Sequence, residues 1–282
     1  MKKLRISRWE GRLEQFEDLI AEEGLLLVNI GPGPGPEPEL SFSAAITPEQ
    51  VKSFVFGYLL SEGLIQGKDD VREYHEYGEQ LREIPGEVIH VDLRLRELPK
   101  DEVPWQRDYN IIWSECGGGS SSSGGGGWSS EGFGSSLRFR LEAQEPHPLI
   151  SGEELIQIPV KIAGEIEGFK RTGAYHYAFL FDPELNLKAK AKDIGRHNAV
   201  DKVIGEELLG EGRFAERLLF TTGRITADIV LKCLRAGIPL IASRGAALWR
   251  AVVLARRYNL GVVGFLRGRR FNIYSGEGWI EL

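Results

Sequence analysis

Two short stretches of the sequence carry the residue types that proteins use to bind phosphate. Residues 221–224 (TTGR) and 243–246 (SRGA) each combine one or two hydroxyl side chains, an arginine and a glycine that allows close approach of the backbone. Each stretch also stands directly before a segment with helical patterning, and the N-terminus of a helix attracts anions. Neither stretch matches a P-loop or a dinucleotide fingerprint. Helix capping with exposed arginines is therefore the alternative interpretation.

The densest polar run lies at residues 193–202 (DIGRHNAVDK), which hold six polar or charged side chains. The solvated start of a helix does not need so many, whereas hydrogen bonding to a ligand or to a catalytic loop would use them. Asn198 is a plausible N-cap for the apolar helical run that follows. A structural role for the whole run is an equally open interpretation.

Three single residues are further candidates for chemistry. His176 stands at the start of a predicted strand, where a lone histidine is more often a hydrogen-bonded core residue than a ligand. Cys116 precedes a glycine run, where a thiol is accessible to a partner. Cys233 lies among apolar residues of a predicted helix, which is typical of a buried small hydrophobe. With only 2 cysteines far apart in the chain, neither a disulfide framework nor a cysteine-based zinc site is expected.

Seventeen of the 20 residues at positions 117–136 are glycine or serine. Such a segment cannot bury enough apolar surface to offset the entropy lost when it is ordered. We expect a flexible, poorly ordered loop that begins directly after Cys116. A natural low-complexity insertion and an engineered linker would both have this composition.

The C-terminal half alternates strand-like and helix-like segments, which predicts a mainly parallel sheet with helices on its faces. In such sheets ligands bind at the carboxyl ends of the strands, and both phosphate-binding stretches stand at such ends. Predicted strands lie at residues 175–181, 218–222, 239–243, 261–266 and 271–274, and predicted helices at residues 198–209, 225–236 and 246–258.

The clearest element of the N-terminal half is a helix that ends at Gly63. Thr47 is predicted to be its N-cap, Pro48 fits the first helical position, and Gln50 completes a capping box. Strand-like segments lie at residues 25–30, before a Gly/Pro-rich break, and at residues 88–93 within the strand-like region 70–112.

The composition is that of a soluble globular protein, with 42% hydrophobic and 27% charged residues. No apolar run reaches the length of a membrane span, and the N-terminus lacks the apolar stretch of a signal peptide, so we expect a cytoplasmic protein.

The formal net charge of -6 is unevenly distributed along the chain. Residues 190–282 hold 16 Lys or Arg and 9 Asp or Glu, a balance of +7, so the remaining residues carry -13. This asymmetry indicates an anionic ligand, with chance and solvated helix faces as the alternative. The scattered basic residues and a pI of about 5.6 argue against bulk nucleic-acid binding.

Several of these stretches together resemble the FdhD/NarQ family of formate dehydrogenase accessory proteins. Residues 193–205 (DIGRHNAVDKVIG) are nearly the family's most distinctive run. Residues 57–65 (GYLLSEGLI) resemble its GFLLSEGII segment, and residues 172–176 (TGAYH) resemble its TGGxH motif. Shorter matches continue in the same order at residues 222–225, 236–239, 263–265 and 270–274.

This resemblance implies an α/β fold, with a cytidine deaminase-like core whose mainly parallel sheet is flanked by helices, and a smaller N-terminal α+β part. The expected division is an N-terminal part at residues 1–115, a flexible loop at residues 116–137 and a C-terminal cofactor-binding part at residues 138–282. The family also implies a cytoplasmic homodimer, and the composition predicts neither nucleic acid nor a membrane as a partner.

The implied function is that of a sulfurtransferase. Members of the family take sulfur from a cysteine desulfurase and deliver it to the bis-molybdopterin guanine dinucleotide cofactor, with molybdenum or tungsten, of the formate dehydrogenase catalytic subunit. GDP or GTP would mimic part of that cofactor. The alternative is a cofactor-binding chaperone of the same family that transfers no sulfur. A zinc deaminase is rejected, because the sequence has no H-x-E or P-C-x-x-C ligand motif.

Carried over by residue, the resemblance makes Cys116 the persulfide carrier. The family has a C-x-x-C loop there, but Trp113 and Gly119 occupy the two positions where a second cysteine could stand. Arg196 and His197 are the cations expected to favour the Cys116 thiolate if the loop folds back over them. No metal ligand is expected, and the predicted cofactor-binding residues are Phe265, Leu266, Arg267, Gly268, Arg269, Arg270, Thr222, Gly223, Arg224, Ser243, Arg244, His176, Arg196 and His197.

Overall fold

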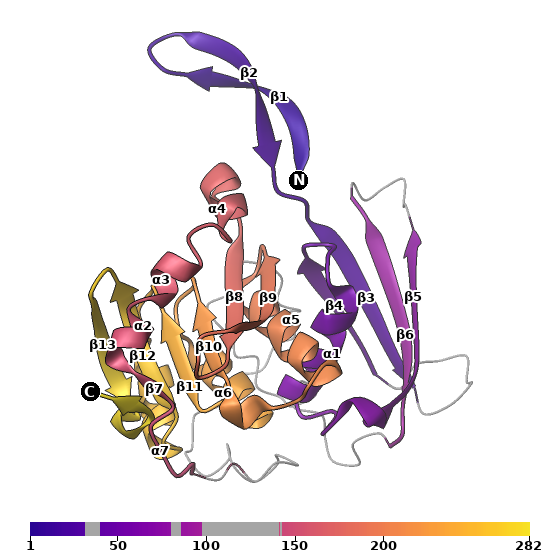
Figure 1. The fold of residues 1–282 in the computed structure, drawn as a ribbon. Coiled ribbons are helices and arrows are strands. Elements are labelled where there is room, and N and C mark those ends of the chain that lie inside the picture. Colours follow the sequence, from indigo (N-terminus) through magenta and orange to yellow (C-terminus); the bar gives the residue numbers. More distant parts are fainter. Residues whose placement is uncertain (32–39, 80–85, 98–140, 142) are drawn as a thin grey trace, which may run out of the picture.

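The computed structural model describes residues 1–31, 40–79, 86–97, 141 and 143–282 (Figure 1). Cys116 and the glycine- and serine-rich residues 117–136 lie outside the described residues, so the predicted flexible loop stays a prediction. Within the described ranges, no helix combines the length and the apolar character needed to cross a membrane.

The C-terminal half forms a six-stranded sheet in the order β13-β12-β11-β10-β8-β9. Strands β10, β11 and β12 run parallel to one another, whereas β8 is antiparallel to β9 and β10, and β13 is antiparallel to β12. The sheet is therefore mixed, and the prediction of a mainly parallel sheet is wrong. The strands are β8 (His176–Phe181), β9 (Leu187–Asp193), β10 (Leu218–Thr221), β11 (Leu240–Ser243), β12 (Gly261–Arg267) and β13 (Arg270–Ser275).

The lengths of the connections explain this mixture. Residues 182–186 join β8 to β9, and residues 268–269 join β12 to β13. Such short segments allow only a hairpin, whereas a parallel pair needs a crossover. The helices α6 (Ala227–Ala236) and α7 (Trp249–Arg257) supply the two crossovers, between β10 and β11 and between β11 and β12.

Helices cover both faces of this sheet. Leu219 and Ile241 pack in one core cluster with residues of α5 (Arg196–Leu209), α6 and α7, whereas Phe220 and Ala242 pack in another with residues of α2 and α3. This alternation follows from the two-residue period of a strand. The predicted helices α5, α6 and α7 are confirmed with shifted starts. The second layer holds α2 (Gly152–Leu155), α3 (Ile158–Lys161), α4 (Glu167–Thr172), and the strand pair β7 (Ile150–Ser151) and β14 (Ile280–Glu281).

The N-terminal half contributes a four-stranded sheet in the order β4-β3-β6-β5 and the helix α1 (Val51–Ser61). Alternate residues of β3, namely Leu26, Val28 and Ile30, are fully buried in the same core cluster as α1. Figure 1 shows α1 and α5 between the two sheets. The strands are β3 (Gly24–Gly31), β4 (Leu40–Ile46), β5 (Val71–Glu79) and β6 (Val88–Leu95). The short 3-10 helices among the described residues are η1 (Lys68–Asp70), η3 (Phe214–Glu216) and η4 (Glu277–Trp279).

Two predicted helix caps are wrong. Helix α1 starts at Val51 after Gln50, whose backbone is left-handed with φ 55°. Thr47 is buried, its amide donates to Asp193 Oδ2 over 2.9 Å, and its hydroxyl accepts from the amide of Ile194. Helix α5 begins after Gly195, so Asn198 lies within it. Both polar side chains are used in tertiary contacts, which local sequence patterns do not reveal.

A β-hairpin at the N-terminus projects from the rest of the molecule (Figure 1). It consists of β1 (Lys2–Trp9) and β2 (Leu13–Ile20), which pair in antiparallel register with most side chains exposed. Sequence patterns did not predict it. The expected three-part division of the chain stays a prediction.

Candidate functional site

One edge of the six-stranded sheet collects the predicted turns. The parallel strands β10, β11 and β12 all end there, and β8 begins there because it runs antiparallel to β10. Strand β9 also ends at this edge, with Asp193 paired to His176. Residues 221–224, 243–246 and 265–270, together with Arg196 at the start of α5, therefore lie along what we call the carboxyl edge.

The first two turns are interlocked by their hydroxyl groups. Ser243 Oγ donates to the carbonyl oxygen of Gly223 over 2.5 Å and accepts from the amide of Gly245 over 2.8 Å. Thr222 Oγ1 accepts from the amide of Tyr177 over 3.0 Å. A Cβ atom on Gly245 would lie 2.9 Å from the carbonyl oxygen of Gly223, so only glycine allows this approach. The predicted hydroxyls thus hold the turns in place, and the backbone shape of the turns depends on them.

The third stretch, residues 265–270, attaches to the second turn. The amide of Phe265 donates to the carbonyl oxygen of Gly245 over 2.9 Å, and Arg267 Nε donates to that of Arg244 over 3.0 Å. Phe265 has a left-handed backbone with φ 53°, which is uncommon for a bulky residue, and it lies where the register of β12 against β13 shifts. The side chain of Leu266 is fully buried in the core, so only its backbone could face a ligand.

Exposed arginines line the carboxyl edge. We define the basic rim as Arg224, Arg244, Arg267, Arg269 and Arg270, all of which are exposed. Guanidinium groups bind phosphate and carboxylate oxygens through paired hydrogen bonds. The predicted anion-binding residues are therefore brought together, with their charged groups accessible to solvent.

His176 and Arg196 both lie against Gly223 of the first turn. A Cβ atom on Gly223 would stand 3.0 Å from Arg196 Cβ and 3.5 Å from His176 Nδ1. Burial lowers the pKa of His176, and the charges of Arg196 and Arg224 lower it further. His176 is therefore neutral at neutral pH, able to accept and donate one hydrogen bond.

His197 is not the cation that the sequence predicted. Its Nε2 lies 3.0 Å from Thr226 Oγ1 and 3.6 Å from Asp228 Oδ2. Burial lowers the pKa of His197 to about 3, and the neighbouring Arg196 contributes to that shift. Of Arg196 and His197, only Arg196 is therefore positively charged at neutral pH.

Part of the dense polar run has a structural role. Asp193 accepts hydrogen bonds from the amides of Thr47 and Gly195 and forms an ion pair with Lys202 Nζ at 2.7 Å. Lys202 also donates to the carbonyl oxygen of Thr47 over 2.8 Å. Both charged side chains are fully buried. This group fastens the segment before α1 to the end of β9, so Asp193 and Lys202 have a structural role, and ligand binding by other residues of the run stays a prediction.

A second buried ion pair joins α1, α5 and α6. Lys232 Nζ lies 3.1 Å from Asp201 Oδ2, and Ser61 Oγ donates to Asp201 Oδ1 over 2.7 Å. Burial alone would lower the pKa of Lys232, but Asp201, Asp228 and other acidic neighbours raise it well above its usual value. The next residue, Cys233, is fully buried, and burial raises the pKa of its thiol, as expected of an unreactive cysteine.

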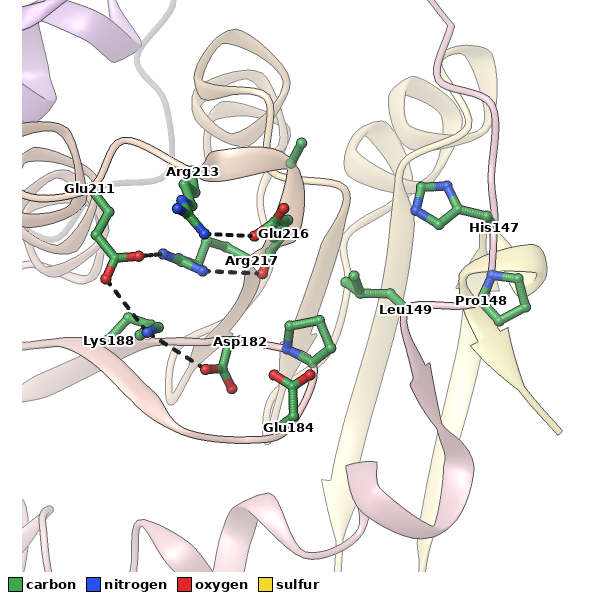
Figure 2. A pocket seen from close by; sticks show the side chains of 12 residues that line it. His147, Pro148, Leu149, Asp182, Glu184, Lys188, Glu211, Arg213, Glu216 and Arg217 are labelled. Atoms are coloured by element: carbon green, nitrogen blue, oxygen red, sulfur yellow. Dashed lines mark hydrogen bonds and ion pairs between the residues drawn. The ribbon is translucent and has the colours of Figure 1, made fainter.

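A cavity of about 510 Å³ lies at the opposite edge of the sheet, where β8 ends and β10 begins (Figure 2). Most of its charged side chains are paired with one another. Arg217 lies 2.9 Å from Glu207 and 2.8 Å from Glu211, and Lys188 bridges Asp182 and Glu211. The cavity contains none of the predicted site residues.

Comparison with known proteins identifies the family. Residues 39–281 match the model of the FdhD/NarQ family, so this chain belongs to that family. A protein of Sulfurisphaera tokodaii named sulfur carrier protein FdhD is 33% identical over 230 residues, which cover 81% of this chain and 80% of the relative. A Thermoplasma acidophilum protein of the same name is 31% identical over 270 residues, 94% of this chain and 87% of the relative. The fold resembles a crystal structure described as a formate dehydrogenase accessory protein from Desulfotalea psychrophila, with a TM-score of 0.71, 22% identity and 99% coverage of both chains.

Proposed function

We propose that this protein is a sulfur carrier for the maturation of formate dehydrogenase. The observation that carries the proposal is its membership of a family whose relatives are named sulfur carrier proteins. The interlocked turns and the basic rim support it, because exposed arginines beside glycine-containing turns suit the phosphates of a nucleotide-containing cofactor.

In this proposal the sulfur travels on Cys116 as a persulfide. The Cys116 thiolate attacks the outer sulfur of a persulfide on a cysteine desulfurase, the donor's S–S bond breaks, and the donor cysteine leaves as a thiolate. This exchange needs no external oxidant. Passing the terminal sulfur on as sulfide takes two electrons, which a thiol reductant supplies, and regenerates the Cys116 thiolate.

The proposed acceptor is the bis-molybdopterin guanine dinucleotide cofactor, bound as a substrate at the carboxyl edge. The arginines of the basic rim would hold its phosphates, and the backbone at residues 222–223 and 265–268 would lie against the nucleotide. Charge-assisted hydrogen bonds of this type are about twice as strong as neutral ones. GDP and GTP would bind as partial mimics of the cofactor.

The same proposal includes the partners and setting of the reaction. A cysteine desulfurase donates the sulfur, and the catalytic subunit of formate dehydrogenase receives the finished cofactor. We propose a cytoplasmic homodimer with a cytidine deaminase-like core, as the family implies. Arg196, buried behind Gly223, supplies the positive charge that would favour a thiolate arriving at this edge.

A cofactor-binding chaperone without sulfur transfer is the second candidate. It is favoured by the single cysteine at the loop position, since Gly119 and Trp113 leave Cys116 without a resolving partner. The two functions share the carboxyl edge and differ only in Cys116. The test is whether Cys116 gains one sulfur atom from a cysteine desulfurase.

A further inference from the structure

Trp249 is a large aromatic side chain that contributes nothing to the core. It is the first residue of α7 and is 79% exposed, whereas Ala251, Val252 and Ala255 of the same helix are buried. Val253, one turn further along, is also exposed. Single exposed apolar side chains are common on protein surfaces, so the neighbours of Trp249 decide what it can bind.

Trp249 stands next to the interlocked turns of the carboxyl edge. The amide of Ile225 donates to the carbonyl oxygen of Ala246 over 2.9 Å, and the amide of Leu248 donates to that of Ile225 over 3.0 Å. Ala247 and Ile225 also form a parallel bridge. This parallel register places Trp249 beside Ala227, at the start of α6 and three residues beyond the basic-rim residue Arg224.

The sequence on either side of Trp249 is positively charged over a long stretch of chain. Residues 229–276 contain no aspartate or glutamate and nine lysines or arginines. This stretch includes all of α7 and four of the five arginines of the basic rim. An exposed aromatic side chain near many positive charges suits a ligand that is both anionic and planar. An apolar protein surface would bind the aromatic side chain but would gain little affinity from the arginines.

We propose that Trp249 stacks on the guanine base of the nucleotide whose phosphates the basic rim holds. The inference rests on the proposed function and extends it to the base. Nucleobases stack on aromatic side chains through their π faces, and arginines bind the phosphates of the same ligand. Trp249 therefore makes the carboxyl edge a site for a nucleotide rather than for phosphate alone.

Calorimetric titration of the full chain with GDP and with inorganic pyrophosphate tests this proposal. Trp249→Ala should weaken GDP binding roughly 5- to 100-fold and leave pyrophosphate binding unchanged, since the loss of one stacked base has effects of that order. Trp249→Phe should retain most of the GDP affinity. Trp9→Ala is the matched control, because Trp9 is 71% exposed on the distant hairpin, and it should bind GDP like the wild type.

The outcomes separate this inference from the function on which it rests. If the wild type binds GDP and Trp249→Ala binds it equally well, stacking is excluded and the proposed function stands. An equal loss of GDP and pyrophosphate binding would also overturn stacking, because the substitution would then act through the turns. A change in oligomeric state with unchanged GDP affinity would assign Trp249 to a protein contact. If the wild type binds no GDP, the proposed nucleotide site itself is wrong.

Discussion

Gly57 of α1 and Gly205 of α5 meet backbone to backbone where the two helices cross. A Cβ atom on either residue would lie 2.7 Å from the amide nitrogen of the other. The Cβ atom on Gly57 would lie 1.8 Å from the carbonyl oxygen of Asp201, and the Cβ atom on Gly205 would lie 1.7 Å from the carbonyl oxygen of Ser53. Both glycines belong to stretches that resemble family motifs, and their role here is to bring the N-terminal helix onto the C-terminal sheet.

We therefore expect Gly57→Ala and Gly205→Ala each to destabilise the protein by about 2–3 kcal/mol or more, because the helices must separate. This loss outweighs the gain of up to about 1 kcal/mol that alanine brings to a helix. Urea unfolding measures the change. Gly164→Ala is the control, since a Cβ atom there meets no atom within 4 Å. Wild-type stability in both helix variants would refute the close crossing.

Stability should fall as the pH is lowered because of His197. Its pKa in the folded protein is about 3, against about 6.5 in an unfolded chain. Between these values the unfolded state binds a proton that the folded state does not, so acid favours unfolding. Above about pH 6.5 this contribution is constant. Between these two pKa values, the free energy of unfolding should fall by up to about 1.4 kcal/mol for each pH unit.

The measurement is urea unfolding of the wild type and of His197→Asn at several pH values between 7 and 4. The wild type should lose stability faster than the variant as the pH falls, because asparagine does not titrate. Arg196 and Lys232 add to burial in lowering the pKa of His197, and Glu62 opposes them. Parallel stability profiles for the two proteins would show that His197 does not titrate in this window.

The basic rim should carry the affinity for nucleotide phosphates. We expect Arg224→Ala and Arg244→Ala each to weaken GDP binding roughly 10-fold or more, since a hydrogen bond to a charged group contributes about 1.5–3 kcal/mol. Added salt should reduce the difference, because these arginines are exposed. Arg213→Ala, at the opposite edge of the sheet, is the control. Unchanged calorimetric affinity in both rim variants would place the nucleotide elsewhere.

The sequence predicted the elements whose signals are local. The helices α5, α6 and α7 follow from periodic apolar residues, and α6 ends at Gly237 in a left-handed conformation as its sequence indicates. The parallel character of the sheet was overestimated, because strand alternation does not reveal that β8–β9 and β12–β13 are hairpins. The exposed β1–β2 hairpin was missed, since it has no buried face to impose a clear apolar pattern.

The candidate site was predicted only in part for a related reason. The turns at residues 221–224 and 243–246 are recognisable from their own composition, and the structure brings them together. The hydrogen bond between Thr47 and Asp193 joins residues 146 positions apart, and no local pattern could indicate it. The neutral state of His197 likewise depends on burial and on Arg196, which only the folded structure defines.

The central claim is that Cys116 carries sulfur. The protein is incubated with a cysteine desulfurase and cysteine, and intact-mass spectrometry measures the adduct. Wild type and Cys233→Ser should each gain about 32 Da, the mass of one sulfur atom, and should support formate dehydrogenase activity, whereas Cys116→Ser should do neither. A sulfur adduct and full activity in Cys116→Ser, or no adduct on the wild type, would contradict the carrier role and leave the cofactor-binding chaperone in its place.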